Sequence, residues 1–129
     1  MVDLSDLIAR VEAASGGDRE LDHAIHYHLV VVKSDRFTER SWTTQAKAEN
    51  WNTPRYSSSI DAALTLLPEG IELDLKLRKD GTGYACAWTH HGNRSSTGAA
   101  LTLATLSAIL KARQASTTAQ QSEAQSNDQ

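Results

Sequence analysis

Two short stretches of the chain combine an arginine with a run of hydroxyl side chains. They are Arg55-Tyr56-Ser57-Ser58 and Arg94-Ser95-Ser96-Thr97, and each comes just before a segment with helical periodicity. The free N–H groups and the dipole at the start of a helix favour an anion there, and arginine is a bidentate donor to phosphate. We therefore expect a site for a small anionic ligand such as a nucleotide, with Trp51 as a stacking surface.

The same two stretches also suit plain helix capping, because serine and threonine are preferred at helix starts whether or not a ligand binds. They do not form a P-loop, since the sequence has no GxxxxGK[ST] motif. This pattern disfavours hydrolysis of a nucleoside triphosphate. We expect a non-enzymatic binding protein that needs no cofactor.

Three histidines, His23, His26 and His28, form a His-x-x-His-x-His pattern. His23 and His26 share one face of a predicted helix, and three imidazoles can hold zinc with one open position. Histidines near the end of a helix are also favoured by its dipole without any metal. No HExxH motif or second cysteine–histidine pair accompanies them. A histidine-dependent metalloenzyme is therefore an alternative, and the favoured reading assigns no metal ligand.

Cys86 is the single cysteine of the chain, and Asp80, His90 and His91 lie near it in sequence. A cysteine–histidine pair can act as nucleophile and base. Cys86, however, lies in a predicted strand between two alanines, which is typical of a small buried side chain. One cysteine also excludes an intramolecular disulfide and a thiolate metal cluster. The sequence therefore nominates no catalytic residue.

The composition narrows the class of protein further. The chain has 129 residues, which fits one domain, and its net charge is -3. No basic stripe is present for the many phosphate contacts that duplex nucleic acid needs. No apolar run approaches the roughly 20 residues of a membrane span, and acidic residues stand where a signal peptide needs positive ones. We expect a cytoplasmic protein that binds neither duplex nucleic acid nor a membrane.

The elements that must position these residues predict an α+β fold, with a small, mainly antiparallel sheet and helices packed on both of its faces. Residues 71–78 alternate strictly between apolar and charged side chains, so they predict a half-buried strand that pairs with residues 84–89 as a hairpin. Residues 28–32 predict a further strand, whereas residues 36–50 are ambiguous between its hairpin partner and a helical turn. Residues 90–97 predict a polar loop. Helical periodicity marks the segments 4–11, 18–25 and 60–67.

Residues 98–113 predict a helix whose apolar side chains cover more than one face. Such a helix is either central to the core or shared with a partner subunit, so we expect a homo-oligomer. A protein-interaction or structural accessory module, with this helix as the interface, is therefore the main alternative function. Residues 114–129 contain no large apolar side chain, so they predict a disordered tail behind a single domain of residues 1–113.

Two of these stretches resemble the phage ABA-sandwich domain family. Tyr56 to Gly70 is similar to the family's Tyr-x-x-Ser-Leu-Asp-Ala-Ala-Leu-x-Leu-x-Pro core, and Ala99 to Arg113 is similar to its Ala-Leu-rich final helix ending in Lys-Ala-Arg. The opening, Leu4 to Asp22, also fits, whereas Ile71 and Leu73 stand where the family usually carries tryptophan. The resemblance implies helices on both faces of a small sheet, in a phage or prophage protein within the host cytoplasm. It implies no functional residue, because its motif concerns capping and core.

Overall fold

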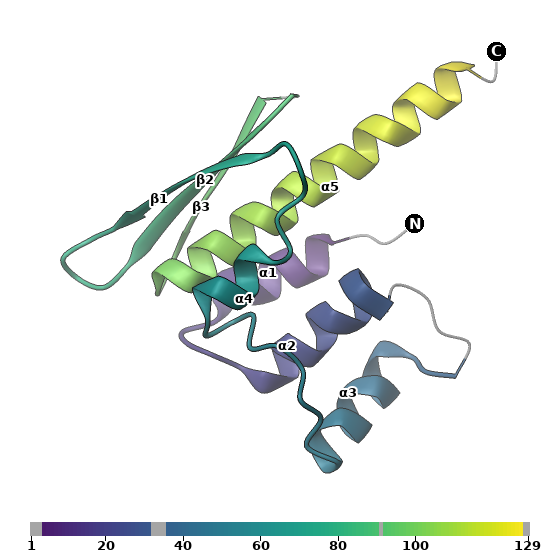
Figure 1. Ribbon diagram of the computed structural model, residues 1–129, viewed down its shortest axis with the longest axis vertical. Coiled ribbons are helices and arrows are strands. Elements are labelled where there is room, and N and C mark those ends of the chain that lie inside the picture. Colours follow the sequence, from purple (N-terminus) through teal and green to yellow (C-terminus); the bar gives the residue numbers. More distant parts are fainter. Residues whose placement is uncertain (1–3, 32–35, 91, 128–129) are drawn as a thin grey trace.

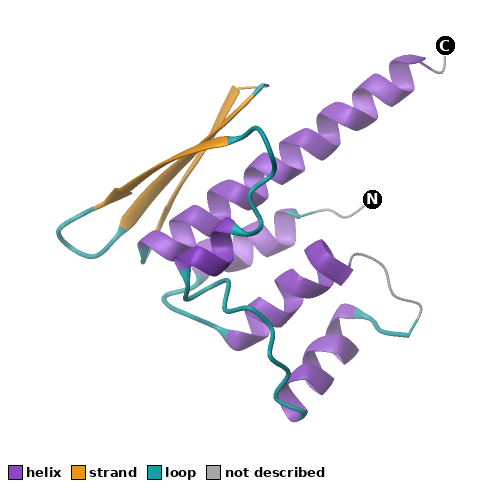
Figure 2. Ribbon diagram, in the orientation of Figure 1, coloured by secondary structure: helices purple, strands orange, loops and turns teal. Residues whose placement is uncertain are grey.

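The computed structural model describes residues 4–31, 36–90 and 92–127, with side chains as far as Ala115. Helices and a π-helical turn make up the first half, and three strands and a long helix make up the second (Figures 1 and 2). In chain order these elements are α1 (Ser5–Ala13), α2 (Arg19–His26), η1 (Tyr27–Val31), α3 (Glu39–Ala48), α4 (Ile60–Leu64), β1 (Glu72–Leu77), β2 (Gly83–Thr89), β3 (Gly92–Gly98) and α5 (Leu101–Asn127).

The three strands form one antiparallel sheet in the order β1-β2-β3. Leu75 of β1 lies opposite Ala85 of β2, which in turn lies opposite Ser96 of β3. The α+β class, the antiparallel sheet and the hairpin are therefore confirmed. The expected polar loop at residues 90–97 was wrong, because residues 92–98 form β3. Residues 92–98 are glycine and polar residues alone, so they lack the apolar alternation that marks a half-buried strand.

Helix α5 lies between the sheet and the other helices (Figure 1). Its alanines Ala104, Ala108 and Ala112 pack on Ala85 and Ala87 of β2. Small side chains on both sides let the helix approach the strands closely. The predicted helix of residues 98–113 is thus central to the core, which was one of its two expected positions.

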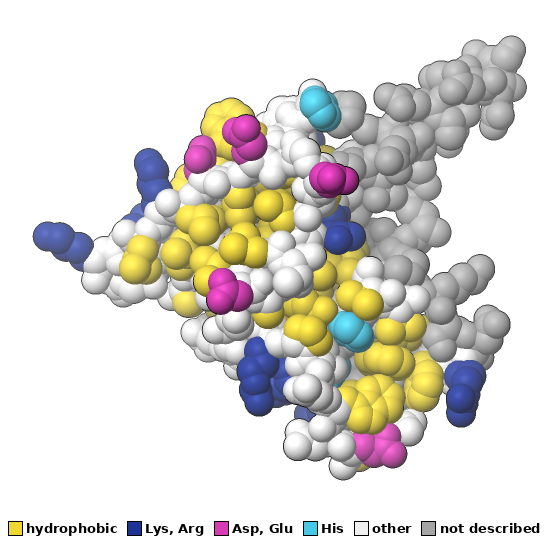
Figure 3. Space-filling model, in the orientation of Figure 1, with side chains coloured by type: hydrophobic (Ala, Val, Ile, Leu, Met, Phe, Trp, Pro, Cys, Tyr) yellow, Lys and Arg dark blue, Asp and Glu magenta, His cyan; other side chains and the backbone are white. Residues whose placement is uncertain are grey.

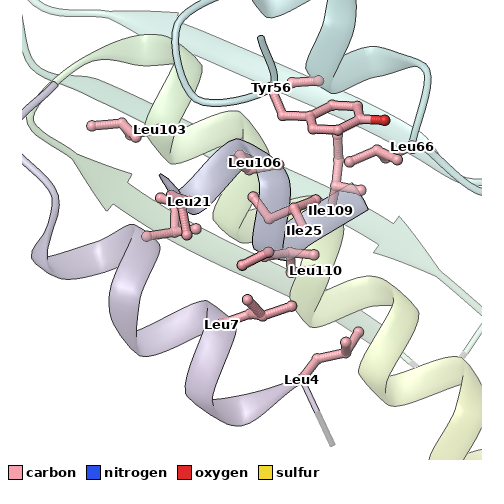
Figure 4. Close-up of a cluster of buried hydrophobic side chains, with 13 residues drawn as sticks. Leu4, Leu7, Leu21, Ile25, Tyr56, Leu66, Leu103, Leu106, Ile109 and Leu110 are labelled. Atoms are coloured by element: carbon pink, nitrogen blue, oxygen red, sulfur yellow. The ribbon is translucent and has the colours of Figure 1, made fainter. Parts of the chain in front are cut away.

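The opposite side of α5 carries large apolar side chains and packs on the remaining helices. Figure 4 shows Leu106, Ile109 and Leu110 of α5 with Leu7 of α1 and Ile25 of α2 in one buried cluster. This layer order differs from the expected sheet with helices on both faces. Among the described residues, the helices lie on one side of the sheet (Figure 2), because α5 itself offers a second apolar surface on which they pack.

In the first half of the chain, the predicted start of α2 is confirmed, whereas the strand predicted after it is not found among the described residues. Asp18 caps α2 as expected, because its carboxylate accepts hydrogen bonds from the N–H groups of Glu20 and Leu21. The strand expected at residues 28–32 was wrong as far as the structure describes it, since Tyr27–Val31 continue α2 as a π-helical turn. Packing of the Tyr27 ring on Trp42 of α3 outweighs the β propensity of this segment.

The ambiguous residues 36–50 contain helix α3. Its start is a capping box in which Thr38 accepts a hydrogen bond from Ser41 N–H and the Ser41 side chain accepts one from Thr38 N–H. Serine replaces the usual glutamate or glutamine in this motif, so the sequence signal was weak.

Helix α5 starts at Leu101 rather than at residue 98, and its backbone continues to Asn127, past the predicted domain end at Arg113. Alanine, glutamine and glutamate in this stretch are good helix formers. The division into a domain of residues 1–113 and a disordered tail of residues 114–129 stays a prediction.

The contact between the sheet and α5 yields a test of the fold. Gly83 of β2 lies against the first turn of α5, and a Cβ at Gly83 would lie 2.8 Å from the Leu101 backbone nitrogen. We expect Gly83→Ala to lower the free energy of unfolding by about 1–3 kcal/mol, because the backbone of β2 or α5 must move. Urea unfolding followed by circular dichroism measures the change.

Gly16→Ala is the matched control, since no atom lies within 4 Å of the added Cβ at that position. It should leave the unfolding midpoint unchanged or raise it. Equal stability of the Gly83→Ala variant and the parent protein would contradict the close approach of α5 to β2.

Candidate functional site

The first predicted cluster, Arg55-Tyr56-Ser57-Ser58, lies in a turn before α4 rather than at the start of that helix. Helix α4 begins at Ile60 and is capped by Ser59, whose side chain accepts a hydrogen bond from Ala62 N–H. Tyr56 and Ser57 are buried, whereas Arg55 and Ser58 are exposed. Only the outer half of the cluster is therefore accessible to a ligand.

Ser57 belongs to a buried polar network that joins α2 to this turn. Oδ1 of the buried Asp22 accepts hydrogen bonds from Ser57 N–H at 2.7 Å and from Ser57 Oγ at 2.6 Å. Its Oδ2 forms an ion pair with Arg19 at 3.0 Å. Arg19 also donates to the backbone oxygens of Trp51 and Thr53. Buried charges need such partners, so these residues hold the turn on α2.

Trp51 is also engaged within the protein. Its ring contacts Trp42 edge to face, with 4.8 Å between the ring centroids. Its Nε1 donates to a carboxylate oxygen of Glu49 at 2.8 Å. Phe37 completes this aromatic cluster. Trp51 is half-buried, so its ring packs on α3 and is not free to stack on a ligand.

Each of the three histidines has a partner of its own. Nδ1 of His23 lies 2.9 Å from Thr53 Oγ1, and Nδ1 of His26 lies 3.0 Å from the Tyr56 hydroxyl. Nε2 of His28 lies 3.4 Å from Glu39. Within the described ranges, no group of three or more His, Cys, Asp or Glu side chains is placed to hold a metal ion. The histidine hypothesis gains no support from this geometry.

Burial lowers the pKa of His23 and of His26 below the usual 6.5. The positive charge of Arg19 lowers the pKa of His23 further, although Asp22 acts in the opposite direction. Both imidazoles are therefore favoured in the neutral form, which suits hydrogen bonding to Thr53 and Tyr56.

Cys86 and Asp80 serve separate roles. Cys86 is buried in β2 as expected, between Asp74 of β1 and Ser95 of β3. Asp80 lies in the hairpin turn, where a hydrogen bond from the Thr82 hydroxyl is the main cause that lowers the pKa of its carboxyl group. His91 lies outside the described residues.

The second predicted cluster, Arg94-Ser95-Ser96-Thr97, lies in β3, so the expectation that it starts a helix was wrong. The Ser96 hydroxyl faces α5 and lies 2.8 Å from the Ser107 hydroxyl. The Nζ atom of Lys111 donates to the Ser95 backbone oxygen and pairs with Glu12, each at 3.0 Å. Among the described residues, no hydrogen bond or ion pair joins this cluster to Arg55–Ser58.

A small hollow of about 270 Å³ lies beside β3. Its lining consists of Glu12, Tyr84, Ser95, Ser96, Thr97 and Lys111. A larger cleft of about 580 Å³ lies among α1, α2 and α3. Sequence reasoning missed the larger cleft because it did not predict α3.

The larger cleft is lined by both signs of charge. Arg10 pairs with Glu39 at 2.7 Å, and Lys47 pairs with Glu20 at 3.3 Å. Arg40 and Asp6 also line the cleft, so its three cations face three carboxylates and it offers little attraction to an anion.

The outer margin of the sheet is the feature that sequence reasoning missed most clearly. Strand β1 is an edge strand, and its Leu75 and Leu77 are 36% and 69% exposed. Figure 3 shows that hydrophobic side chains gather in patches on one face of the molecule. The alternation of residues 71–78 predicted the strand, but alternation does not tell an edge strand from a central one.

Comparisons of the chain with family models, with curated proteins and with solved structures find no match. The resemblance to the phage ABA-sandwich family therefore stays a prediction. No helix among the described residues is both long and apolar enough to cross a membrane.

The neutral histidines predict a pH dependence of stability. The pKa values of His23 and His26 are lower in the folded protein than in the unfolded chain, so the unfolded chain binds more protons as the pH falls below about 6.5. The free energy of unfolding should therefore decrease as the pH is lowered from 7.5 to 5. Chemical denaturation at several pH values measures this slope.

His23→Gln should flatten that slope, because glutamine does not titrate and can still hydrogen bond to Thr53. His90→Gln, which removes an exposed histidine, is the control and should leave the slope unchanged. A slope that is the same in all three proteins would refute the assignment to His23.

Proposed function

We propose that the protein is a non-catalytic interaction module that binds a protein strand at the free edge of β1. The main support for this proposal is that the edge strand β1 displays two exposed leucines, Leu75 and Leu77. A strand edge binds an extended segment through its backbone groups, and flanking side chains add selectivity.

The hydrogen-bond pattern of β1 supports this proposal. The N–H group of Arg78 donates to the Thr82 backbone oxygen on the β2 side. Backbone groups of a strand alternate in direction, so Asp74 and Lys76 also face β2, whereas the N–H and C=O groups of Leu73, Leu75 and Leu77 face outward. Among the described residues, no backbone hydrogen bond outside the sheet ladder involves those three leucines. The edge is therefore available for a further strand.

Helix α5 is not available as the interface that the sequence suggested. Leu106, Ile109, Leu110 and Ala108 are all buried within the chain. The protein-interaction alternative therefore needs another apolar surface, and β1 supplies it.

A small anionic ligand is the second candidate. It is favoured by the hollow beside β3, where four hydroxyl side chains and Lys111 surround about 270 Å³. Ligand pockets are typically about 300–1,000 Å³, so a hollow of this size suits a group of phosphate size better than a whole nucleotide. The ion pair of Lys111 with Glu12 weakens the attraction of this hollow for an anion.

Site-directed photo-crosslinking tests the interaction module. Cys86 is buried, so Leu77→Cys supplies the accessible thiol to which a benzophenone maleimide is attached. We expect illumination in a bacterial lysate to join a protein to position 77, because a bound strand lies beside it. Mass spectrometry then identifies the product.

Val30→Cys is the matched control, since Val30 is an apolar side chain that is 52% exposed on η1. Equal crosslinking at positions 30 and 77, or none at 77, would refute an interaction surface at β1. Native mass spectrometry of the unlabelled protein would show the second candidate as a small retained mass that is released on denaturation.

A further inference from the structure

The charged side chains of β1 are arranged by sign along the strand. Leu73 packs on the alanines that lie between the sheet and α5. The odd-numbered residues of β1 therefore face α5, and the even-numbered residues face away from it. The even positions are Glu72, Asp74, Lys76 and Arg78, with two acids followed by two bases. Among the described residues, none of these four side chains forms an ion pair within the chain. Asp74 accepts a hydrogen bond from Trp88 Nε1 at 2.7 Å, which leaves its charge in place.

This order of charges is complementary to itself in the antiparallel direction. When Leu75 lies opposite Leu75 of a second copy, Asp74 lies opposite Lys76 and Glu72 lies opposite Arg78. Opposite charges across neighbouring strands are stabilising, and like charges are destabilising.

Other registers lack this complementarity. A register centred on Asp74 places two aspartates opposite each other, and one centred on Lys76 does the same for two lysines. A parallel pairing in register would set Glu72 beside Glu72. Among antiparallel registers, the one centred on Leu75 is therefore alone in placing all four charged residues opposite a residue of unlike sign.

The hydrogen-bond alternation is compatible with this register, as with every register that sets odd-numbered residues opposite odd-numbered ones. Leu73, Leu75 and Leu77 are the residues whose backbone groups face outward. In the register centred on Leu75, each of them meets another outward-facing residue, since Leu73 lies opposite Leu77 of the second copy. Asp74 and Lys76 then form a pair without backbone hydrogen bonds, in which side chains are closest.

The apolar side chains gain from the same pairing. A two-fold axis perpendicular to the sheet keeps the α5 faces of both copies on one side, so there Leu75 meets Leu75 and Leu77 meets Leu73 of the second copy. Leu75 and Leu77 are 36% and 69% exposed in the single chain. The pairing removes that apolar surface from water.

We infer that the strand bound at β1 is β1 of a second copy of this chain, paired antiparallel with Leu75 opposite Leu75. The inference rests on the proposed interaction at this edge and names its partner. The two three-stranded sheets join into one continuous sheet. The contact uses the same surface on both copies, so it closes at a dimer.

Charge reversal at the outermost pair tests the register. Glu72→Lys and Arg78→Glu each place like charges opposite each other at both ends of the two-fold interface. Analytical ultracentrifugation of the full chain should show a dimer for the parent protein, and a dimer dissociation constant about tenfold weaker or more for each single variant. An equimolar mixture of the two variants should regain the dimer, because the base introduced at position 72 of one copy then meets the acid introduced at position 78 of the other.

The mixture also controls for folding, since a misfolded variant cannot be rescued by another. A parent protein that stays monomeric would overturn the second copy as partner, and crosslinking at position 77 in a lysate would then show that the edge binds another protein. A parental dimer that neither single variant weakens would overturn the interface and its register. In that case the charges of β1 serve to prevent edge pairing, which is a common role of charged side chains on edge strands.

Discussion

Helix α5 is buried on every side along residues 103–110, and the rest of the structure is arranged around it. Alanines line the side that faces β2, and leucine and isoleucine line the side that faces α1 and α2. The two polar side chains in this stretch find partners, since Thr105 bonds to the Leu101 backbone oxygen and Ser107 bonds to Ser96. A helix that is apolar on all sides must be surrounded by other elements of the protein, which shield it from water. The sheet supplies one layer of that cover, and the helices supply the other.

The same arrangement explains why β1 is left incompletely covered. Helix α5 packs mainly along β2 and β3 and touches β1 much less. Leu73 reaches the alanine cluster, whereas Leu77, near the hairpin, is more than half exposed. The leucines of β1 therefore continue the apolar underside of the sheet beyond the helix that covers it. A surface of this kind at a strand edge is where binding or aggregation occurs, and the ordered charges of β1 favour a defined partner.

Sequence reasoning succeeded where a local pattern fixes the element. The alternation of residues 71–78 and the capping side chain of Asp18 identified β1 and the start of α2. It failed where tertiary contacts decide. Residues 92–98 pair with β2 although their side chains are polar, and Tyr27–Val31 remain helical while the Tyr27 ring packs on Trp42. The two Arg-Ser clusters have similar sequences, yet Ser57 forms a hydrogen bond with Asp22 and Ser96 forms one with Ser107. No spacing rule reveals such long-range partners.

The most direct measurement is amide hydrogen exchange of the parent protein at a low and a high protein concentration. The amides of Leu73, Leu75 and Leu77 face the open edge, whereas those of Asp74 and Lys76 face β2 and serve as internal controls. A β1–β1 dimer predicts that the three leucine amides become protected as the concentration rises, while the two control amides keep their protection. Leucine amides that exchange at the same rate at both concentrations, while sedimentation shows a monomer at the low one and a dimer at the high one, would contradict pairing through this edge.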